Sequence, residues 1–462
     1  MAFDSLIFIL YFLPITLFMY YISKEKYRNF ILLVESIIFY IWGGSQTLVI
    51  ILISIVFNYL FGYLIYEYKK YKKSILYIGV SFNILILIYY KYTDFFISNY
   101  NSLTSSNHTL LKLIVPLGIS YITFQQISYI VDIYRKTVPF ENNFINYALY
   151  ITFFPKIIAG PITKYSSIKD NINHREYSDD LFKEGAFRFS LGLGKKVLIS
   201  NTLAIIANKI FAIDPNLLGF NISFLGMITY TLQLYFDFSG YTDMAIGIAK
   251  MFSINLPENF NKPYKSKGFI DFWRRWHISL SGFLRDYIYI PMGGSRVSKN
   301  RLIFNTLTLF FISGFWHGAN FTFIIWGLYH GLFIVIERLG ASKIYKVLPS
   351  FISEVITFLL VGIGWIFFRA DNLKYALKYI LSLIDIRHIT PIISFNLEID
   401  TKFWIILVLA IIIVFTPKLQ DQEIFQNKIY SIISKVFSIM VLIYSIAVIT
   451  TGSFMPFIYL NF

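Results

Sequence analysis

The sequence predicts an all-α polytopic integral membrane protein, with about eleven transmembrane helices and further re-entrant and interfacial helices. One reason is composition: the 462 residues are 56% hydrophobic and 15% charged, with a mean hydropathy of +0.61. Soluble domains are roughly 45–50% apolar and 25% charged. The other reason is that apolar stretches long enough to cross a membrane recur along the chain, and a helix satisfies its own backbone polar groups in lipid.

Length and composition place these apolar stretches. They lie at residues 6–21, 29–42, 47–66, 74–90, 110–130, 145–160, 188–211, 222–248, 302–316, 321–337, 352–369, 402–416 and 434–458. Prolines and glycines interrupt 145–160 and 188–211. Because broken helices at membrane depth usually line a cavity, we expect some stretches to be re-entrant or to lie on the surface.

Basic residues in the early loops predict the orientation. Lys24, Lys26 and Arg28 follow the first stretch, and four lysines lie within residues 69–73. Positively charged loops stay in the cytoplasm, so the polar loop 93–109 and the N-terminus are expected outside. The net charge of +15 is also explained by basic residues in cytoplasmic loops, which face anionic lipid. No nucleic-acid partner is expected.

We expect one membrane-bound domain over residues 1–462, because no repeat and no low-complexity linker divides the chain. The polar stretch 164–183 predicts a cytoplasmic loop with a surface helix, and Leu373–Ile384 has the spacing of an interfacial helix. The chain has no cysteine. Disulfides, thiolate metal sites and a cysteine-acyl intermediate are therefore excluded.

Residues 257–331 are too densely charged for an ordinary span and are expected to form a cytoplasmic re-entrant or surface element. Four basic side chains there are candidates for binding an anionic acyl donor: Lys265, Arg274, Arg275 and Arg285. Arginine and lysine suit phosphate groups such as those of coenzyme A. A basic loop that reaches lipid headgroups explains the same composition.

A histidine follows the apolar stretch 302–316. Ionisable residues at membrane depth tend to face an interior cavity, so His317 is a functional candidate, although a neighbouring helix would also satisfy a neutral imidazole. Gly318 beside it allows close approach of a backbone or a substrate. His330 lies roughly 220° further around an uninterrupted helix, so it shares a face with His317 only if the helix breaks near residues 318–320.

The other histidines, His108, His174 and His388, stand in polar loops and are expected at the surface. Since no histidine pair shows the spacing of zinc ligands, no metal is predicted. Two acids, Asp237 and Asp243, interrupt the stretch 222–248. They would carry protons in a transporter, orient a catalytic histidine, or pair with the arginine-rich element.

Several motifs resemble the membrane-bound O-acyltransferase family. They are Asp271-Phe272-Trp273-Arg274-Arg275-Trp276-His277, Arg285-Asp286-Tyr287, Ile290-Pro291-Met292-Gly293-Gly294 and Phe315-Trp316-His317-Gly318. The resemblance spans nearly the whole chain, with a motif core at residues 110–337. Because Pro116-Leu117-Gly118 and Phe153-Phe154-Pro155 also match it, the bacterial branch of alginate and peptidoglycan O-acetyltransferases is the most similar.

The resemblance implies a central tunnel lined by His317, the family's essential histidine, and by His277, its second motif histidine. It implies acetyl-CoA as the donor, with no permanently bound cofactor. The acetyl group would move outward for O-acetylation of a cell-surface polysaccharide, by way of the Ser or Tyr hydroxyl of an extracytoplasmic SGNH-type acetyltransferase. The protein would lie in the bacterial cell membrane.

Acyl transfer to a hydroxyl needs a base, and an imidazole with a pKa of about 6.5 suits that role. We assign the base to His317 and positioning of the thioester to His277, with Trp316, Asn320 and Asp237 in support. Three alternatives stay open. They are D-alanyl transfer to teichoic acid, a proton-coupled polysaccharide or lipid-sugar transporter, and a structural subunit of a secretion complex.

Overall fold

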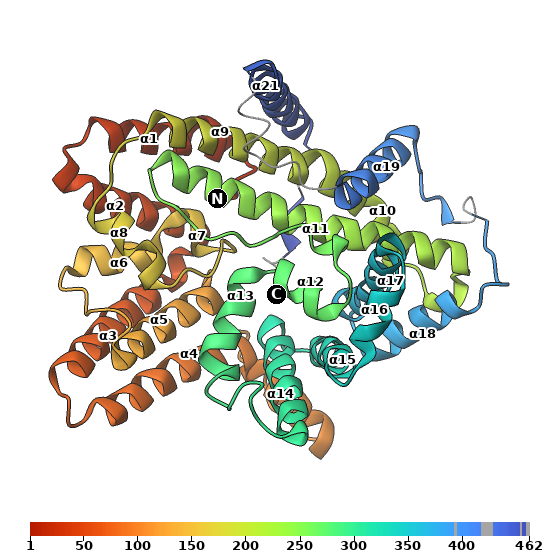
Figure 1. The fold of residues 1–462 in the computed structure, drawn as a ribbon, viewed down its shortest axis with the longest axis horizontal. Helices are drawn as coiled ribbons and strands as arrows, with labels where there is room; N and C mark the ends of the chain where they lie inside the picture. Colours follow the sequence, from red (N-terminus) through yellow and green to blue (C-terminus); the bar gives the residue numbers. More distant parts are fainter. Residues whose placement is uncertain (392–394, 417–427, 453–454, 459–462) are drawn as a thin grey trace. The chain divides into compact units, whose positions relative to one another are not determined.

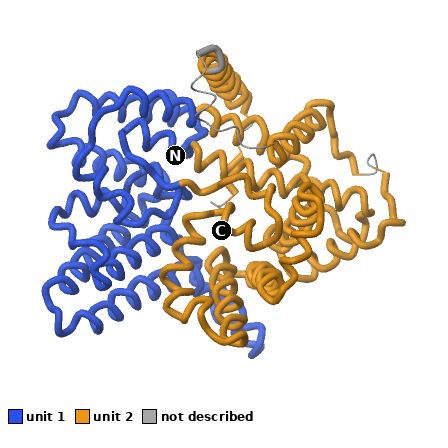
Figure 2. The backbone as a smooth tube through the Cα atoms, viewed as in Figure 1, with its two compact units in different colours: residues 1–189, 244–257 blue, residues 190–243, 258–462 orange. Residues whose placement is uncertain are grey.

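The computed structural model describes residues 1–391, 395–416, 428–452 and 455–458. Every regular element within these ranges is a helix (Figure 1). The helices form two compact units, Met1–Phe189 with Met244–Pro257 and Ser190–Asp243 with Glu258–Phe462 (Figure 2). The predicted all-α class is confirmed, whereas the single domain stays a prediction.

Six helical runs of the described chain are long and apolar enough to cross a membrane. They are Glu25–Glu67, Lys72–Thr104, Asp179–Phe211, Phe321–Arg338, Ser350–Arg369 and Ser431–Thr450. Two shorter apolar helices lie at Phe8–Ile22 and Thr401–Phe415. The protein is therefore a polytopic membrane protein, as predicted, while the predicted number of spans stays a prediction.

The first unit is built from the N-terminal helices. These are α1 (Leu13–Ile22), α2 (Glu25–Gly44), α3 (Leu48–Glu67), α4 (Lys72–Thr104), α5 (Ile119–Arg135), α6 (Phe144–Thr152), α7 (Phe154–Ile157), α8 (Tyr165–Asn173) and most of α9 (Asp179–Gly194). Two buried asparagines join α3 to α4: Asn58 and Asn83 exchange side-chain hydrogen bonds of 3.1 and 2.6 Å. Interhelical amide pairs of this kind hold helices together where lipid gives no hydrophobic driving force.

Two predictions about this unit were wrong. The loop expected at 93–109 is helical as far as Thr104, because polar residues alone do not end a helix that contains neither glycine nor proline there. Conversely, the stretch 110–130 becomes helical only at Ile119, after Pro116 and after Gly118, whose φ is +68°. A Cβ at Gly118 would lie 2.2 Å from the Ile157 carbonyl oxygen. The interruption expected in 145–160 is confirmed by the end of α6 and the separate helix α7.

The second unit contains the motif region and the C-terminal helices. These are α10 (Asn201–Phe211), α12 (Phe269–Arg275), α13 (Ile278–Leu284), α14 (Lys299–His317), α15 (Phe321–Arg338), α16 (Ile344–Val347), α17 (Ser350–Arg369), α18 (Leu373–Ile384), α19 (Thr401–Phe415) and α21 (Lys428–Thr450). The long helix α11 (Phe220–Met251) contributes to both units. The helix predicted at Leu373–Ile384 has those bounds in α18.

The stretch 188–211 is not broken by its glycines, contrary to expectation. A π-helical turn, Lys195–Ser200, connects α9 directly to α10, and π-turns occur often at functional sites. Close packing against this stretch depends on Gly240 of α11, since a Cβ there would lie 2.8 Å from the Gly192 carbonyl oxygen. The stretch does line a cavity, as expected of it, and that cavity belongs to the candidate site.

Helices α14 and α15 pack through glycines. A Cβ at Gly314 would lie 2.3 Å from the Phe323 carbonyl oxygen, and one at Gly327 would lie 2.2 Å from the Phe310 carbonyl oxygen. Small residues let membrane helices approach until their backbones touch. This contact fixes the position of the C-terminal end of α14, where His317 lies.

Candidate active site

His317 is the last residue of α14 and lies among aromatic rings. Its ring centroid is 5.0 Å from that of Trp326, at an interplanar angle of 90°, and 5.4 Å from that of Phe368. The ring centroid of Trp316 lies 4.8 Å from that of His317. His317 is only 4% exposed, so its imidazole is buried and held among these rings.

The space beside Gly318 is taken by a side chain, not by a backbone or a substrate. A Cβ at Gly318 would lie 2.2 Å from the Phe323 ring. Phe323 in turn packs edge-on against Phe368, with ring centroids 5.0 Å apart. Gly318 therefore allows the ring of Phe323 to pack close to the end of α14.

His330 belongs to the same aromatic cluster. His330 was expected near His317 only if the helix breaks between them. That break is present, because α14 ends at His317 and α15 begins at Phe321. Trp326 lies 5.1 Å from His330 and 5.0 Å from His317, ring to ring. The indole nitrogen of Trp273 donates to His330 Nδ1 at 3.3 Å, which places the proton of a neutral His330 on Nε2.

Trp326 has a buried indole N–H without an acceptor among the described residues. Native proteins rarely leave such a donor unsatisfied. The Trp326 ring that carries this N–H contacts the rings of both His317 and His330.

His277 is oriented by an asparagine. It precedes α13 with a left-handed backbone, φ 45° and ψ 53°, a strained conformation for a residue with a side chain. Asn259 Oδ1 accepts from the Ser279 backbone N–H and lies 3.1 Å from His277 Nδ1, so Nδ1 carries the hydrogen. His277 Nε2 is then the lone-pair nitrogen, and it is buried without a partner in the described part of the chain.

A continuous chain of ring contacts connects His277 to His317, with steps of 4.8 to 5.6 Å. The rings between them are, in order, Phe238, Phe260, Trp276, Trp365 and Trp326. The structure therefore groups His317 with His330 through their shared contact with Trp326, and joins His277 to them through this chain.

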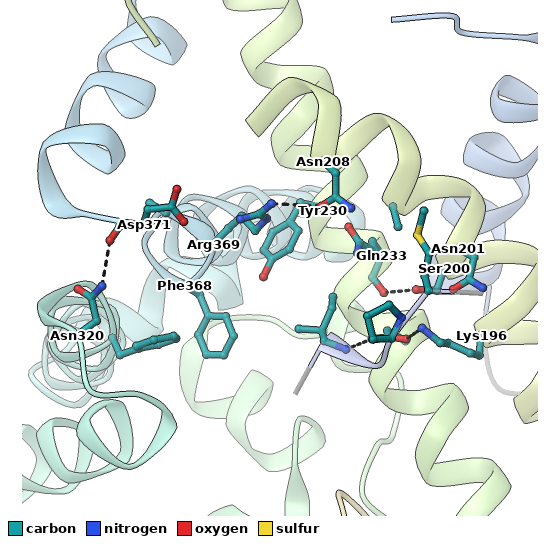
Figure 3. A pocket seen from close by; sticks show the side chains of 17 residues that line it. Lys196, Ser200, Asn201, Asn208, Tyr230, Gln233, Asn320, Phe368, Arg369 and Asp371 are labelled. Atoms are coloured by element: carbon teal, nitrogen blue, oxygen red, sulfur yellow. Dashed lines mark hydrogen bonds and ion pairs between the residues drawn. The ribbon is translucent and has the colours of Figure 1, made fainter. Parts of the chain in front are cut away.

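A polar cavity of about 680 Å³ borders the cluster (Figure 3). Its lining is Lys196, Ser200, Asn201, Ala204, Asn208, Tyr230, Gln233, Asp237, Asn320, Phe323, Phe368, Arg369, Ala370, Asp371, Met455, Pro456 and Ile458. In Figure 3, Asn320 and Asp371 lie at one end and Lys196 and Asn201 at the other. Phe368 contacts the His317 ring, so the cavity reaches the immediate surroundings of the candidate base.

Two of the predicted supporting residues line this cavity. Asn320 caps α15 by accepting from the Thr322 backbone N–H, and it donates to the Asp371 carbonyl oxygen at 3.0 Å. Asp237 is 1% exposed and forms an ion pair of 2.7 Å with Lys196. The third, Trp316, contacts the His317 ring directly.

Both acids of α11 pair with the π-helical turn Lys195–Ser200. Asp243 lies 2.6 Å from the Lys195 ammonium, next to the Asp237–Lys196 pair. These lysine partners were missed by the sequence analysis, which named the arginine-rich element as the ion-pair partner among three roles for the two acids. The signal was present as two adjacent lysines inside an apolar stretch.

A second cavity of about 330 Å³ holds part of the predicted basic site. Arg274 and Arg285 line it, together with Arg338, which sequence analysis missed. Arg338 donates to the Thr306 hydroxyl at 3.0 Å and also to Tyr289. Trp273 and Phe310 of the aromatic cluster close its inner side.

Two of the predicted basic residues do not line this cavity. Arg275 forms an ion pair of 2.9 Å with Asp271 on its own helix. Lys265 lies 3.9 Å from Glu354 and donates to the Phe415 carbonyl oxygen at 3.2 Å. The first contact lies within α12, and the two contacts of Lys265 join the turn Pro263–Lys265 to α17 and α19, which favours a structural role for both side chains.

The loop histidines are at the surface, as predicted: His108, His174 and His388 are exposed.

Comparison with known proteins identifies the family. The family model for membrane-bound O-acyltransferases matches residues 135–347. A probable alginate O-acetylase of Pseudomonas aeruginosa is 44% identical over 384 residues, 81% of this chain and 73% of the relative. The chain belongs to the membrane-bound O-acyltransferase family. It is therefore an integral membrane enzyme that transfers acyl groups, and the predicted family is confirmed.

Two further relatives share a lower identity with this chain. The peptidoglycan O-acetyltransferase of Helicobacter pylori is 37% identical over 428 residues, 84% of this chain and 81% of the relative. The teichoic acid D-alanyltransferase of Bacillus subtilis is 34% identical over 328 residues, 66% of this chain and 80% of the relative. The similarity is thus stronger toward the relatives named for acetyl transfer.

Proposed function

We propose that this O-acyltransferase moves an acetyl group from acetyl-CoA on the cytoplasmic side to an acceptor hydroxyl, for O-acetylation of a cell-surface polysaccharide. The observation that carries the proposal is the position of His317 in a buried aromatic cluster bordered by two cavities of different chemistry. The relatives named as acetylases of alginate or peptidoglycan favour acetyl as the group transferred.

The arginine-lined cavity suits the donor. Its three guanidinium groups, of Arg274, Arg285 and Arg338, match the phosphates of coenzyme A, because arginine binds phosphate through several parallel hydrogen bonds. Trp273 lines this cavity and contacts Trp326, with ring centroids 5.8 Å apart. A thioester arm that passes Trp273 would approach the His317 cluster.

The polar cavity suits the acceptor. Four amide side chains, Asn201, Asn208, Gln233 and Asn320, supply donors and acceptors in its wall, with hydroxyls from Ser200 and Tyr230. Such groups bind hydroxyl-bearing ligands by directional hydrogen bonds. The two cavities and the cluster between them are our proposal for the tunnel that the family resemblance implies.

The reaction follows from this placement. The imidazole of His317 takes the proton of the acceptor hydroxyl, and the hydroxyl oxygen forms a bond to the thioester carbonyl carbon. The carbonyl oxygen becomes an oxyanion, for which the Trp326 N–H is the candidate donor. When the carbon–sulfur bond breaks, the imidazolium returns its proton to the sulfur, and coenzyme A leaves as the thiol.

His277 has a positioning role in this proposal. Asn259 holds its ring, and Phe238 packs edge-on against it at 4.8 Å. The acceptor hydroxyl would belong to an extracytoplasmic SGNH-type acetyltransferase, which then esterifies the polysaccharide. Direct transfer to a polysaccharide would require a thick polymer to reach a buried histidine.

The deciding experiment replaces the cell's own copy of the gene with wild type, His317→Ala or His388→Ala, and measures acetyl ester on the surface polysaccharide. His388 is exposed in a loop, so His388→Ala is the matched control. We expect His317→Ala to abolish the ester at a normal membrane level, while the control retains it. Full ester in His317→Ala would refute the assignment, and D-alanyl ester in place of acetyl would favour the teichoic acid alternative.

A further inference from the structure

The C-terminal segment Met455–Ile458 is built into the second unit. Met455, Pro456 and Ile458 line the polar cavity. Phe457 is 4% exposed and points the other way, into the protein. A segment with one side on a cavity and the other on a packed interior is a wall of that cavity.

Asp237 holds this wall by its second oxygen. Its Oδ1 forms the ion pair with Lys196, and its Oδ2 accepts from the Ile458 backbone N–H at 2.8 Å. Hydrogen bonds to a charged group are stronger than those between neutral groups. The acid that interrupts the apolar stretch 222–248 thus has two partners, Lys196 and Ile458, both of which line the cavity.

Phe457 anchors the other side of the segment. Its ring stacks on Tyr241, with centroids 4.6 Å apart and an interplanar angle of 23°. It also contacts Phe238 at 5.9 Å, and Phe238 packs against His277. The segment therefore lies between the polar cavity and the surroundings of His277.

We propose that Met455–Ile458 closes the polar cavity on the His277 side and limits the size of the group that enters it. The assignment of this cavity to the acceptor rests on the proposed function. The chemistry of the wall specifies the ligand class: the ionic side chains of the lining, Lys196, Asp237, Arg369 and Asp371, carry two charges of each sign. A compact, uncharged hydroxyl-bearing group fits such a lining better than a polyanion.

The absence of cysteine from the chain allows a test that needs no enzymatic activity. Ala204 lines the cavity, so Ala204→Cys gives a single thiol in its wall. The purified full-length protein would be labelled with a small and a bulky methanethiosulfonate reagent, and the two rates compared. We expect the small reagent to react and the bulky one to react far more slowly.

Two variants loosen the wall without removing the ion pair. Phe457→Ala removes the stacking on Tyr241. Ile458→Pro removes the backbone N–H that donates a hydrogen bond to Asp237. Each should raise the rate of the bulky reagent by about tenfold or more relative to the small one, the scale on which pockets discriminate size. Phe403→Ala is the control, because Phe403 is equally buried, at 2% exposed, in α19 and does not line the cavity.

An unchanged ratio of rates in both wall variants would overturn the proposal, as would an equal rise in Phe403→Ala. Monodisperse elution of each variant, together with an unchanged rate for the small reagent, separates opening of the wall from general unfolding. The ester assay of His317→Ala is independent of this labelling. The proposal about the wall can therefore be refuted while the proposed function is supported, and the reverse.

Discussion

At the scale of single residues, the site is defined by nitrogen atoms placed among aromatic rings. The rings of His317 and His330 both contact Trp326. Asn259 orients His277 through a hydrogen bond to the Nδ1 atom of the histidine. A buried polar atom left without a hydrogen bond costs about 1–3 kcal/mol. The unsatisfied N–H of Trp326 and Nε2 of His277 are therefore candidate ligand-binding atoms.

Trp326→Phe keeps an aromatic ring at this position and removes the N–H together with part of the indole. If this donor stabilises the oxyanion, turnover with acetyl-CoA should fall by about 10²–10³, the usual loss for one oxyanion donor. The Michaelis constant should stay near the wild-type value, because the interaction exists only in the transition state. Steady-state kinetics of purified protein would check this. Trp365→Phe removes the same part of a ring in the same cluster, so it is the control for ring size, and equal losses in both variants would contradict a specific role of the Trp326 N–H.

The pair Lys196–Asp237 gives a second prediction at this scale. Both side chains are at most 4% exposed, and breaking a buried pair costs about 3–5 kcal/mol, whereas replacing both ions by apolar residues is often neutral. We expect Lys196→Met to lower the thermal midpoint in detergent, and Lys196→Met with Asp237→Leu to recover much of the loss. No recovery in the double variant would show that the hydrogen bond from Ile458, and not the charge pair, dominates.

At the scale of elements, the contact of α14 with α15 positions the candidate base. The two backbones touch at Gly314 and Gly327, and His317 and Trp326 are each within a few residues of that contact. Any increase in the distance between these helices would separate the imidazole from the indole N–H. Helix packing is thus coupled directly to the geometry of the reaction.

Gly327→Leu should prevent this close approach, because even a Cβ would lie 2.2 Å from the Phe310 carbonyl oxygen. We expect little monodisperse protein and no acetyl ester in complemented cells. Gly282→Ala is the control, since a Cβ there meets nothing within 4 Å and alanine favours helix. Normal yield and activity of Gly327→Leu would contradict the glycine contact.

At the scale of the whole molecule, the charge of the loops predicts how the chain crosses the membrane. Helix α4 has 33 residues and is about 50 Å long, enough to cross a hydrocarbon core of about 30 Å. Its two ends should therefore lie on opposite sides. The lysines before it should be cytoplasmic and residue Asn107 after it should be external.

The cysteine-free chain again permits a direct test. We expect Asn107→Cys to react with a membrane-impermeant maleimide in intact cells, and Lys70→Cys to react only after permeabilisation. Both positions are exposed, so a difference in labelling reports the side of the membrane. Labelling of both from outside would overturn the predicted orientation.

By itself, the sequence determined the membrane class, the helical fold and the candidate histidine of α14. These follow from local properties, because apolar length predicts a membrane helix and a polar residue within such a stretch stands out. Local reasoning failed where a polar stretch was interpreted as a loop, because residues 93–104 belong to helix α4.

Only the tertiary structure decided which side chains meet. Lys196 pairs with Asp237, and Ile458 donates to the same carboxylate from 221 residues away. Arg338 lines the same cavity as Arg274 and Arg285. His330 lies in the same aromatic cluster as His317 because the helix is interrupted between α14 and α15. The physical reason is that these pairings depend on how helices pack against each other, which no local pattern of residues encodes.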